Sequence, residues 1–516
     1  MEKTKNKNYR EQRAKLNIAV SFFGQFILVI CGLITPRVLL GKFGSEIYGI
    51  TTSITTFLGY IIILEGGIGG VAKAALYKPI AEKDWDKMSM VMSEVRRYFL
   101  VIAGAFFVHV VIMACIFHRI SHVEALDRSA TFLLVLVISI SSFAEYFIGI
   151  SNSVFLQADQ KMYISNLLTY AATVLNMIMI VLLTRLDISI IAVKFCSSLV
   201  FSIKPLFLYL YVKKNYKLRR IRSKEKLLKD KWVGLGQHLA YFLHNNTDIF
   251  VLTLFSKPAY VAIYGVHFMV ASQIQKITAT FCSGMDSVFG DMYAKKEKDA
   301  LQKTFGMYET IITLTSIILF SVTAIMLVSF VSVYTKGLKD SASYHQPVFA
   351  VLLVLASLLT QLSAPYNSMV IAAGHFRQTR LGAYGEAIIN ATLSIALIWN
   401  FGLVGIALGT VISTMFRFVY YAIYLSKNIL MRPIGCAVKR MSINALLFAV
   451  MVVTMSIIIN RLNIQNFFIW AAAAAVVTLI CAALTLVVNM IFYREDCLSI
   501  LSKLIHFRPK KRADIQ

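Results

Sequence analysis

Five basic residues lie inside long apolar stretches of this chain of 516 residues: Arg37, Lys194, Lys204, Lys276 and Arg417. A charged side chain at the centre of a bilayer costs at least about 2.5 kcal/mol on insertion scales, so each should face protein or water rather than lipid. Arginine offers a planar fork that binds phosphate through two hydrogen bonds, and lysine acts as a compact point charge. Both types at membrane depth favour the binding of an anion such as a phosphate or diphosphate.

The competing explanation is that some of these side chains extend to the lipid headgroups. Arg37 and Arg417 lie near the ends of their stretches, and Lys204 precedes a basic loop, so headgroup contact would satisfy them. Lys194 and Lys276 are less easily explained in this way. The residues that we expect to bind an anionic substrate are four cations and two amides: Arg37, Lys194, Lys276, Arg417, Gln25 and Asn246.

Three acidic residues could couple movement to an ion: Asp248, Glu145 and Glu386. Among the long apolar stretches, the one that contains Asp248 has the most polar residues. Several amide and histidine side chains precede Asp248 in it. Such a density of polar groups lines a water-filled cavity or joins helices. A buried carboxylate can take up a proton or sodium ion, and it can equally form a structural ion pair with a buried cation. The sequence leaves both functions open.

The elements that must position these residues are membrane-spanning helices. About fourteen apolar stretches have roughly the 17–25 residues that a helix needs to cross a bilayer core of about 30 Å. Helices are required because their backbone groups form hydrogen bonds within one segment. We therefore predict an all-α membrane protein of about 14 transmembrane helices.

The distribution of basic residues supports this number. If both termini are cytoplasmic, the cytoplasmic segments hold 39 of the 52 Lys and Arg residues and the outer loops hold 8. Cytoplasmic loops carry such an excess in membrane proteins, and the loss of one span would remove it. We expect a multi-pass protein of a bacterial cytoplasmic (inner) membrane with both termini inside.

A basic run divides the chain after the sixth span, because residues 213–232 hold ten Lys and Arg. The predicted organisation is a six-helix lobe over residues 1–212, a basic cytoplasmic linker over 213–234, and a second six-helix lobe over 235–425. Residues 426–516 would form two additional helices and a basic cytoplasmic tail. The tripeptide Phe23-Gly24-Gln25 is echoed by Leu235-Gly236-Gln237, as expected if the lobes are repeats with a substrate site near the membrane midplane.

Other function classes are poorly supported. The composition, 58% hydrophobic and 15% charged, excludes an ordinary soluble protein. The net charge of +26 is divided among short loops, which indicates contact with membrane lipids rather than nucleic acid. We recognise no phosphate-binding loop, no HExxH and no nucleophile elbow, and the loops are too short for an enzyme domain. The cysteines show no metal or disulfide spacing. We therefore expect no enzymatic activity, no cofactor and no metal.

Several short motifs resemble bacterial polysaccharide-export flippases of the multidrug/oligosaccharidyl-lipid/polysaccharide exporter superfamily. The similar pieces are the tripeptide Asn246-Thr247-Asp248 and four further segments. Those segments are Thr35-Pro36-Arg37-Val38-Leu39-Leu40, Tyr48-Gly49, Leu64-Glu65-Gly66-Gly67-Ile68-Gly69 and Val261-Ala262-Ile263-Tyr264-Gly265. By motif position, Arg37 is similar to the first-span arginine of the family and Asp248 to its seventh-span acid.

The resemblance implies a two-lobed helical bundle that works by alternating access. It would move an undecaprenyl-diphosphate-linked oligosaccharide from the inner to the outer leaflet, for cell-surface polysaccharide export. The expected partners are the lipid-linked oligosaccharide, membrane lipids and proteins of polysaccharide assembly. A peptidoglycan-precursor lipid flippase and a multidrug exporter of the same superfamily stay open as alternatives, although organic cations would favour an acid-rich cavity.

Overall fold

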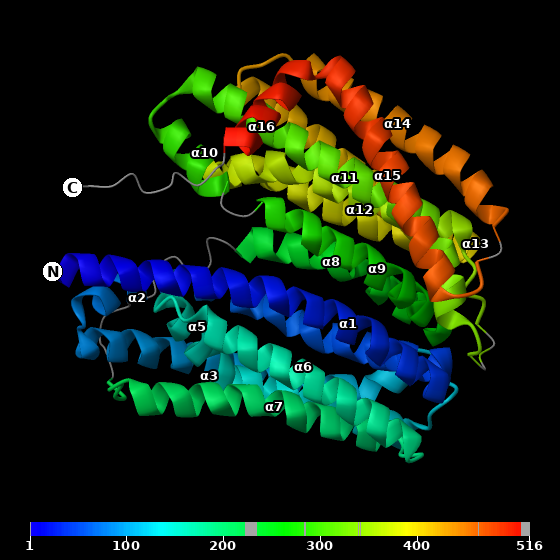
Figure 1. Ribbon diagram of the computed structural model, residues 1–516. Coiled ribbons are helices and arrows are strands. Elements are labelled where there is room, and N and C mark those ends of the chain that lie inside the picture. The colour runs from blue at the N-terminus through cyan, green and yellow to red at the C-terminus, as the bar shows by residue number, and fades with distance from the viewer. Residues whose placement is uncertain are drawn as a thin grey trace. The chain divides into compact units, whose positions relative to one another are not determined.

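The computed structural model describes residues 2–221, 235–282, 285–338, 340, 342–462 and 464–506, and all regular structure in these ranges is helical (Figure 1). Ten helices of the described part are long and apolar enough to cross a membrane. Two of these ten segments, 51 and 52 residues long, contain a glycine break and have the length of two crossings each. The predicted all-α, multi-span fold is confirmed.

The chain divides into two compact units, Met1–Gly265 with Gly337–Ala342, and Val266–Lys336 with Ser343–Gln516. The lobes inferred from the sequence, at residues 1–212 and 235–425, stay a prediction.

The first unit contains a long N-terminal helix and several shorter helices (Figure 1). Its elements are α1 (Glu2–Gly59), η1 (Tyr60–Glu65), α2 (Ile68–Glu82), α3 (Trp85–Ile120), α4 (Arg128–Ala144), η2 (Glu145–Gly149), α5 (Ile150–Ala158), α6 (Met162–Arg185), α7 (Ile190–Asn215), α8 (Leu235–Phe255) and the start of α9 (Pro258–Cys282). Its largest core cluster runs from Ile50 of α1 through Phe106 of α3 to Leu208 of α7.

The second unit holds the rest of α9 and the C-terminal helices. These are α10 (Met285–Ala294), α11 (Lys298–Thr335), α12 (Pro347–Ala372), α13 (Phe376–Asn428), α14 (Gly435–Asn460), α15 (Phe467–Phe492) and α16 (Arg494–His506). α15 packs on α11, where the Trp470 indole donates to the Met326 carbonyl at 3.2 Å and its ring contacts Phe330. The additional C-terminal helices are therefore attached to this unit.

Glycine permits the chain reversals inside the two longest helices. Gly44 in α1 has φ 79° and Gly402 in α13 has φ 53°, conformations that residues with a Cβ rarely adopt. Gly66 and Gly67, both with positive φ, separate η1 from α2 in the glycine-rich segment. Each break ends one helical direction and begins another without a long loop.

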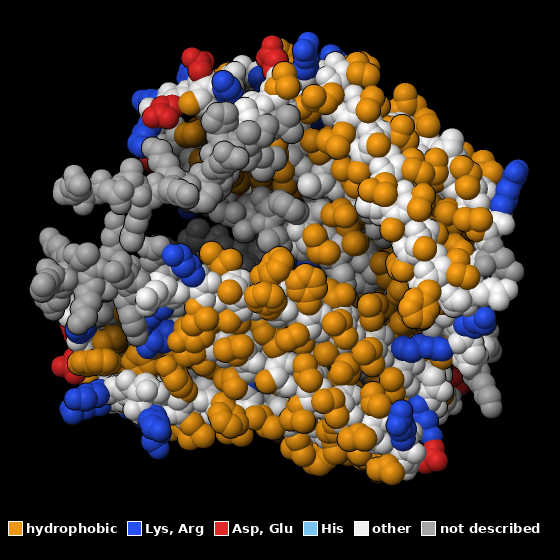
Figure 2. All heavy atoms as spheres, in the orientation of Figure 1, with side chains coloured by type: hydrophobic (Ala, Val, Ile, Leu, Met, Phe, Trp, Pro, Cys, Tyr) orange, Lys and Arg blue, Asp and Glu red, His pale blue; other side chains and the backbone are white. Residues whose placement is uncertain are grey.

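The outer surface has the composition expected for contact with lipid. Phe468 of α15 is 89% exposed and Leu479 is 71% exposed. Figure 2 shows hydrophobic side chains over most of the visible described surface, with Lys and Arg gathered towards its margins. A soluble protein rarely exposes an apolar area of this extent.

Candidate functional site

Lys194 stands on α7 one turn after that helix begins. Ser189 caps the helix, because its hydroxyl accepts from the Ala192 N–H at 3.4 Å. The neighbouring Val193 is fully buried in an apolar cluster that also contains Leu39 of α1 and Ile180 of α6. This packing fixes the backbone from which the Lys194 side chain leaves.

Lys194 is partly buried and forms no ion pair or hydrogen bond with another residue of the described ranges. Two polar atoms nearby in the α6–α7 hairpin also lack a described partner: the Ser197 hydroxyl of α7 and the Asn176 carbonyl oxygen of α6, in residues that are each 8% exposed. Ser197 follows Lys194 by three residues and so shares its helix face. A buried polar group without a partner costs about 1–3 kcal/mol, so a ligand that satisfied these groups would be stabilised here.

Arg37 lies on α1 at the same level as Lys194. The residues that follow it, Val38 and Leu39, pack in the cluster that contains Val193. Lys42, one turn further along α1, forms an ion pair with Asp187 in the turn between α6 and α7. Arg37 and Lys194 therefore leave α1 and α7, which both pack on α6, at similar depth in the first unit.

Gln25 lies three turns before Arg37 on α1 and is partly buried. The adjacent Gly24 permits close packing of α1 on α6, because a Cβ at this position would lie 1.9 Å from Cε2 of Tyr170. The structure thus places Gln25 beside the α1–α6 contact.

Asp248 is buried in α8 of the first unit, 5% exposed, and accepts a hydrogen bond from the Tyr264 hydroxyl at 2.8 Å. Asn246, two residues earlier, donates from its amide to the Phe242 carbonyl of its own helix at 2.9 Å. The side chains of Gln237, His238, His244 and Asn245, which made this helix the most polar in the sequence, lie outside the described residues.

Glu145 begins the π-helical turn η2 and forms an ion pair with Lys204 of α7 at 3.3 Å. Lys204 therefore has a protein partner and does not depend on the headgroups. The adjacent Tyr146 donates to Glu65 at 2.9 Å, which brings the end of η1 to the same place. Two carboxylates and one lysine thus meet within the first unit.

Glu386 and Arg417 form an ion pair with each other at 2.7 Å. They lie on the two halves of α13, Glu386 is 1% exposed, and the Arg417 guanidinium also stacks over the ring of Tyr421 at 5.2 Å. Lys276, in contrast, is exposed on α9. These three residues belong to the second unit, and their roles in binding and coupling stay predictions.

A buried ionic cluster around Glu309 of α11 is absent from the sequence-based expectations. Arg432 donates twice to Glu309, at 3.0 and 3.1 Å, and Arg440 lies 3.4 Å from it. Arg440 also donates to Asp496 of α16 at 2.8 Å, and Tyr366 donates to Glu309. In the sequence, Glu309 only marks the edge of an apolar stretch and the other three charges lie outside the stretches. The sequence feature that could have indicated this cluster is the acidic residue at the edge of the apolar stretch.

The sequence matches no protein-family model and no curated protein. Solved structures are similar in fold. The structure described as lipid II flippase MurJ in an inward closed conformation has a TM-score of 0.67 and 16% identity, and the match covers 93% of this chain and 99% of that one. An inward-facing multidrug resistance MATE family transporter of the MOP superfamily has a TM-score of 0.64 and 14% identity, with coverage of 77% and 95%.

A third similar structure is a complex of the MATE multidrug transporter DinF-BH, with a TM-score of 0.59, 16% identity and coverage of 80% and 95%. At these identities the similarity shows the fold alone. This multi-pass membrane protein therefore has the fold shared by MurJ and the MATE transporters of the MOP superfamily.

Proposed function

We propose that this chain is a transporter that moves an undecaprenyl-diphosphate-linked oligosaccharide from the inner to the outer leaflet by alternating access. It would act in the cytoplasmic membrane of a bacterium, with both termini inside, for export of a surface polysaccharide. The observation that carries this proposal is Lys194, a partly buried cation with no counter-ion in the described ranges, on the same helix face as the buried Ser197 hydroxyl, which also lacks a described partner. A buried cation of this kind is stabilised by an anion, and a diphosphate supplies one.

Arg37 would extend the same site, because it leaves α1 at the level of Lys194. Its guanidinium can bind a phosphate through two parallel hydrogen bonds. A ligand drives a conformational change only if it binds the two states with different affinity, so these cations must be better placed for the diphosphate in one facing state. Lys276, Arg417, Gln25 and Asn246 stay proposed contributors.

Asp248, Glu145 and Glu386 stay the proposed coupling acids. Glu145 and Glu386 form ion pairs with Lys204 and Arg417, so each would exchange that partner for another ion. Asp248 is buried with a tyrosine donor, and a carboxylate in such a site can exchange a proton or a sodium ion as its surroundings change.

Export of a peptidoglycan precursor is the second candidate function. The observation that favours it is the extent of the match, because the structure described as a lipid II flippase covers 93% of this chain and the two MATE transporters cover 77% and 80%. Multidrug export is less well supported. An organic cation would be repelled by Lys194 and Arg37.

The experiment compares Lys194→Gln with Lys214→Gln in a host that depends on this protein. Lys214 is exposed on the same helix, so its variant removes the same charge outside the proposed site. A charge-assisted hydrogen bond contributes roughly 1.5–3 kcal/mol, so we expect Lys194→Gln to lower export about 10-fold or more and Lys214→Gln to leave it nearly unchanged.

Both variants should be produced in equal amount in the membrane. Equal export by the two variants would contradict the anion site. Unchanged export of polysaccharide with a greater sensitivity to cationic drugs would favour multidrug export instead.

A further inference from the structure

A second basic site lies within the first unit, where α3, η2, α5 and α7 surround a pocket of about 220 Å³. Arg96, Lys213, Arg219 and Arg220 contribute to its lining, and no acidic side chain does. None of these four cations forms an ion pair within the described ranges. The pocket therefore concentrates positive charge that forms no ion pair with the described residues.

The segment that supplies two of these cations is attached to α3. The Arg219 N–H donates to the Ser89 hydroxyl at 3.0 Å, and the Ile221 N–H donates to the Ser93 hydroxyl at 3.2 Å. Ser89 and Ser93 are one helical turn apart, so they fix the direction of the segment along α3. The basic residues are held by backbone contacts rather than placed by a free loop.

The other end of this segment is fixed by a tyrosine. The Tyr216 hydroxyl donates to Asp159 and accepts from Lys161 at 2.6 Å, and its ring packs edge-on against Phe155 at 4.8 Å. Arg13 of α1 also pairs with Asp159, at 3.2 Å. The floor of the pocket is thus joined to α1, α5 and α7.

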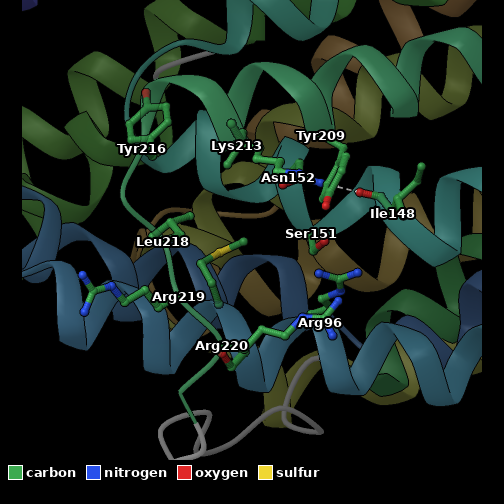
Figure 3. Close-up of a pocket in the computed structure, with 13 residues that line it drawn as sticks. Arg96, Ile148, Ser151, Asn152, Tyr209, Lys213, Tyr216, Leu218, Arg219 and Arg220 are labelled. Carbon is green, nitrogen blue, oxygen red and sulfur yellow. Dashed lines mark hydrogen bonds between the residues drawn. The ribbon is translucent and has the colours of Figure 1, made fainter.

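Cationic groups lie at both ends of the pocket, and one of them is beside the polar side chains. In the view of Figure 3, Arg96 lies with Ser151, Asn152 and Tyr209 at one end, and Arg219 lies towards the other. Ser151 and Asn152 are 6% and 8% exposed. Guanidinium groups with adjacent hydroxyl and amide donors suit the oxygens of a phosphate group.

Exposed apolar side chains continue from the pocket along both flanking helices. On α7, Leu206 and Leu210 are 50% and 56% exposed and lie about two turns and one turn before Lys213. On α3, Leu100 is 38% exposed and follows Arg96 by one turn on the same helix face. A free anion would not contact this apolar surface. A lipid can place its headgroup in the pocket and its acyl chains along the helices.

We propose that this pocket binds the phosphate-bearing headgroup of an anionic membrane lipid. Its volume is below the roughly 300–1,000 Å³ of pockets that enclose drug-sized ligands, which suits a headgroup and excludes a whole oligosaccharide. Basic pockets between membrane helices on the cytoplasmic side bind anionic headgroups in other proteins. The site is separate from Lys194, and its occupation does not depend on the transported cargo.

The test measures lipid binding to the purified protein in detergent by native mass spectrometry. The probe is dioleoylphosphatidylglycerol, with dioleoylglycerol as the analogue that lacks phosphate. Arg96→Gln combined with Arg220→Gln should lower the affinity for the probe about 10-fold or more, because two charge-assisted contacts are lost. The matched control is Arg97→Gln combined with Lys214→Gln, which removes two exposed charges from α3 and the end of α7, at residues that do not line the pocket.

We expect the control to change the affinity less than about twofold and dioleoylglycerol not to compete. An equal loss in the control would show general attraction to the basic surface and would overturn the proposal. Displacement of the lipid by inorganic phosphate at equal concentration would also overturn it, because the site would then recognise a free anion. If the double variant does not fold, Arg220→Gln alone provides the test, since Arg220 is exposed and its loss should still weaken binding about threefold.

Discussion

Replacement of Glu309 by glutamine should destabilise the second unit by about 3–5 kcal/mol. Glu309 is 4% exposed and receives two hydrogen bonds from Arg432, at 3.0 and 3.1 Å. Arg440 lies 3.4 Å away, and Tyr366 donates to the same carboxylate. Glutamine keeps the size of the side chain, removes its charge and replaces one accepting oxygen with an NH2 group.

The magnitude follows from the charges that remain. Coulomb's law at an effective dielectric constant of about 20 gives roughly 5 kcal/mol for each arginine at these distances, before the cost of desolvation. After the substitution, Arg432 and Arg440 face a single carboxylate, Asp496, which contacts only Arg440. The removal of one partner from a buried ion pair leaves an uncompensated charge and typically costs about 3–5 kcal/mol.

The assay is unfolding of the purified protein in mixed micelles with increasing sodium dodecyl sulfate, followed by circular dichroism. Glu82→Gln is the matched control, because its ion pair with Lys78 spans 3.8 Å between side chains that are 49% and 81% exposed. Surface pairs of this kind contribute about 0.5 kcal/mol or less. A loss below about 1 kcal/mol for Glu309→Gln would refute the account of this cluster.

Three further substitutions test the packing and capping of the helices. Gly49→Ala should cost about 1–3 kcal/mol on unfolding, because the new Cβ would lie 1.9 Å from the Pro258 carbonyl oxygen, whereas Gly104→Ala meets nothing within 4 Å and should be tolerated. Tyr264→Phe removes the donor to the buried acid of α8 and should lower the midpoint of detergent unfolding by the equivalent of about 1–3 kcal/mol. A backbone N–H of α3 lowers the pKa of the Asp84 carboxyl, so its stabilising contribution is complete above the ordinary aspartate pKa of about 3.9 and is lost as the pH falls through the lowered value. In a titration of unfolding temperature against pH, Asp84→Asn should therefore reduce the acid dependence.

The helices and the two chain reversals at glycine could be predicted from the sequence. Each depends on residues that are adjacent in the chain. An apolar run of sufficient length must form a helix in lipid. Gly402 stands alone between two apolar stretches, and its positive φ is a conformation that glycine adopts without strain. Gly44 has the same property in α1.

The pairing of charges could be predicted only in part. Glu386 and Arg417 are 31 residues apart and nearly equidistant from Gly402, so the reversal at this glycine places them side by side, and the sequence contained the information for this contact. The cluster around Glu309 could not be found in this way. Its members come from α11, the α13–α14 connection, α14 and α16, and only the packing of these helices brings them together.

The absence of a counter-ion at Lys194 also depends on tertiary structure. The sequence identifies a lysine in an apolar stretch, as it does for Lys204, and the two positions look alike. The structure separates them, because Lys204 pairs with Glu145 while Lys194 has no such partner in the described ranges. The spacing of residues in the sequence does not indicate which buried cation forms an ion pair with an acidic residue and which does not.

The most direct test of the proposed transport is the leaflet distribution of lipid-linked oligosaccharides after depletion of this protein in its host. A membrane-impermeant reagent that labels the sugars from outside would be applied to intact cells and to inverted vesicles. The account predicts accumulation in the inner leaflet, loss of surface polysaccharide, and restoration of both by the unaltered protein but not by Lys194→Gln. An unchanged distribution after depletion would contradict it.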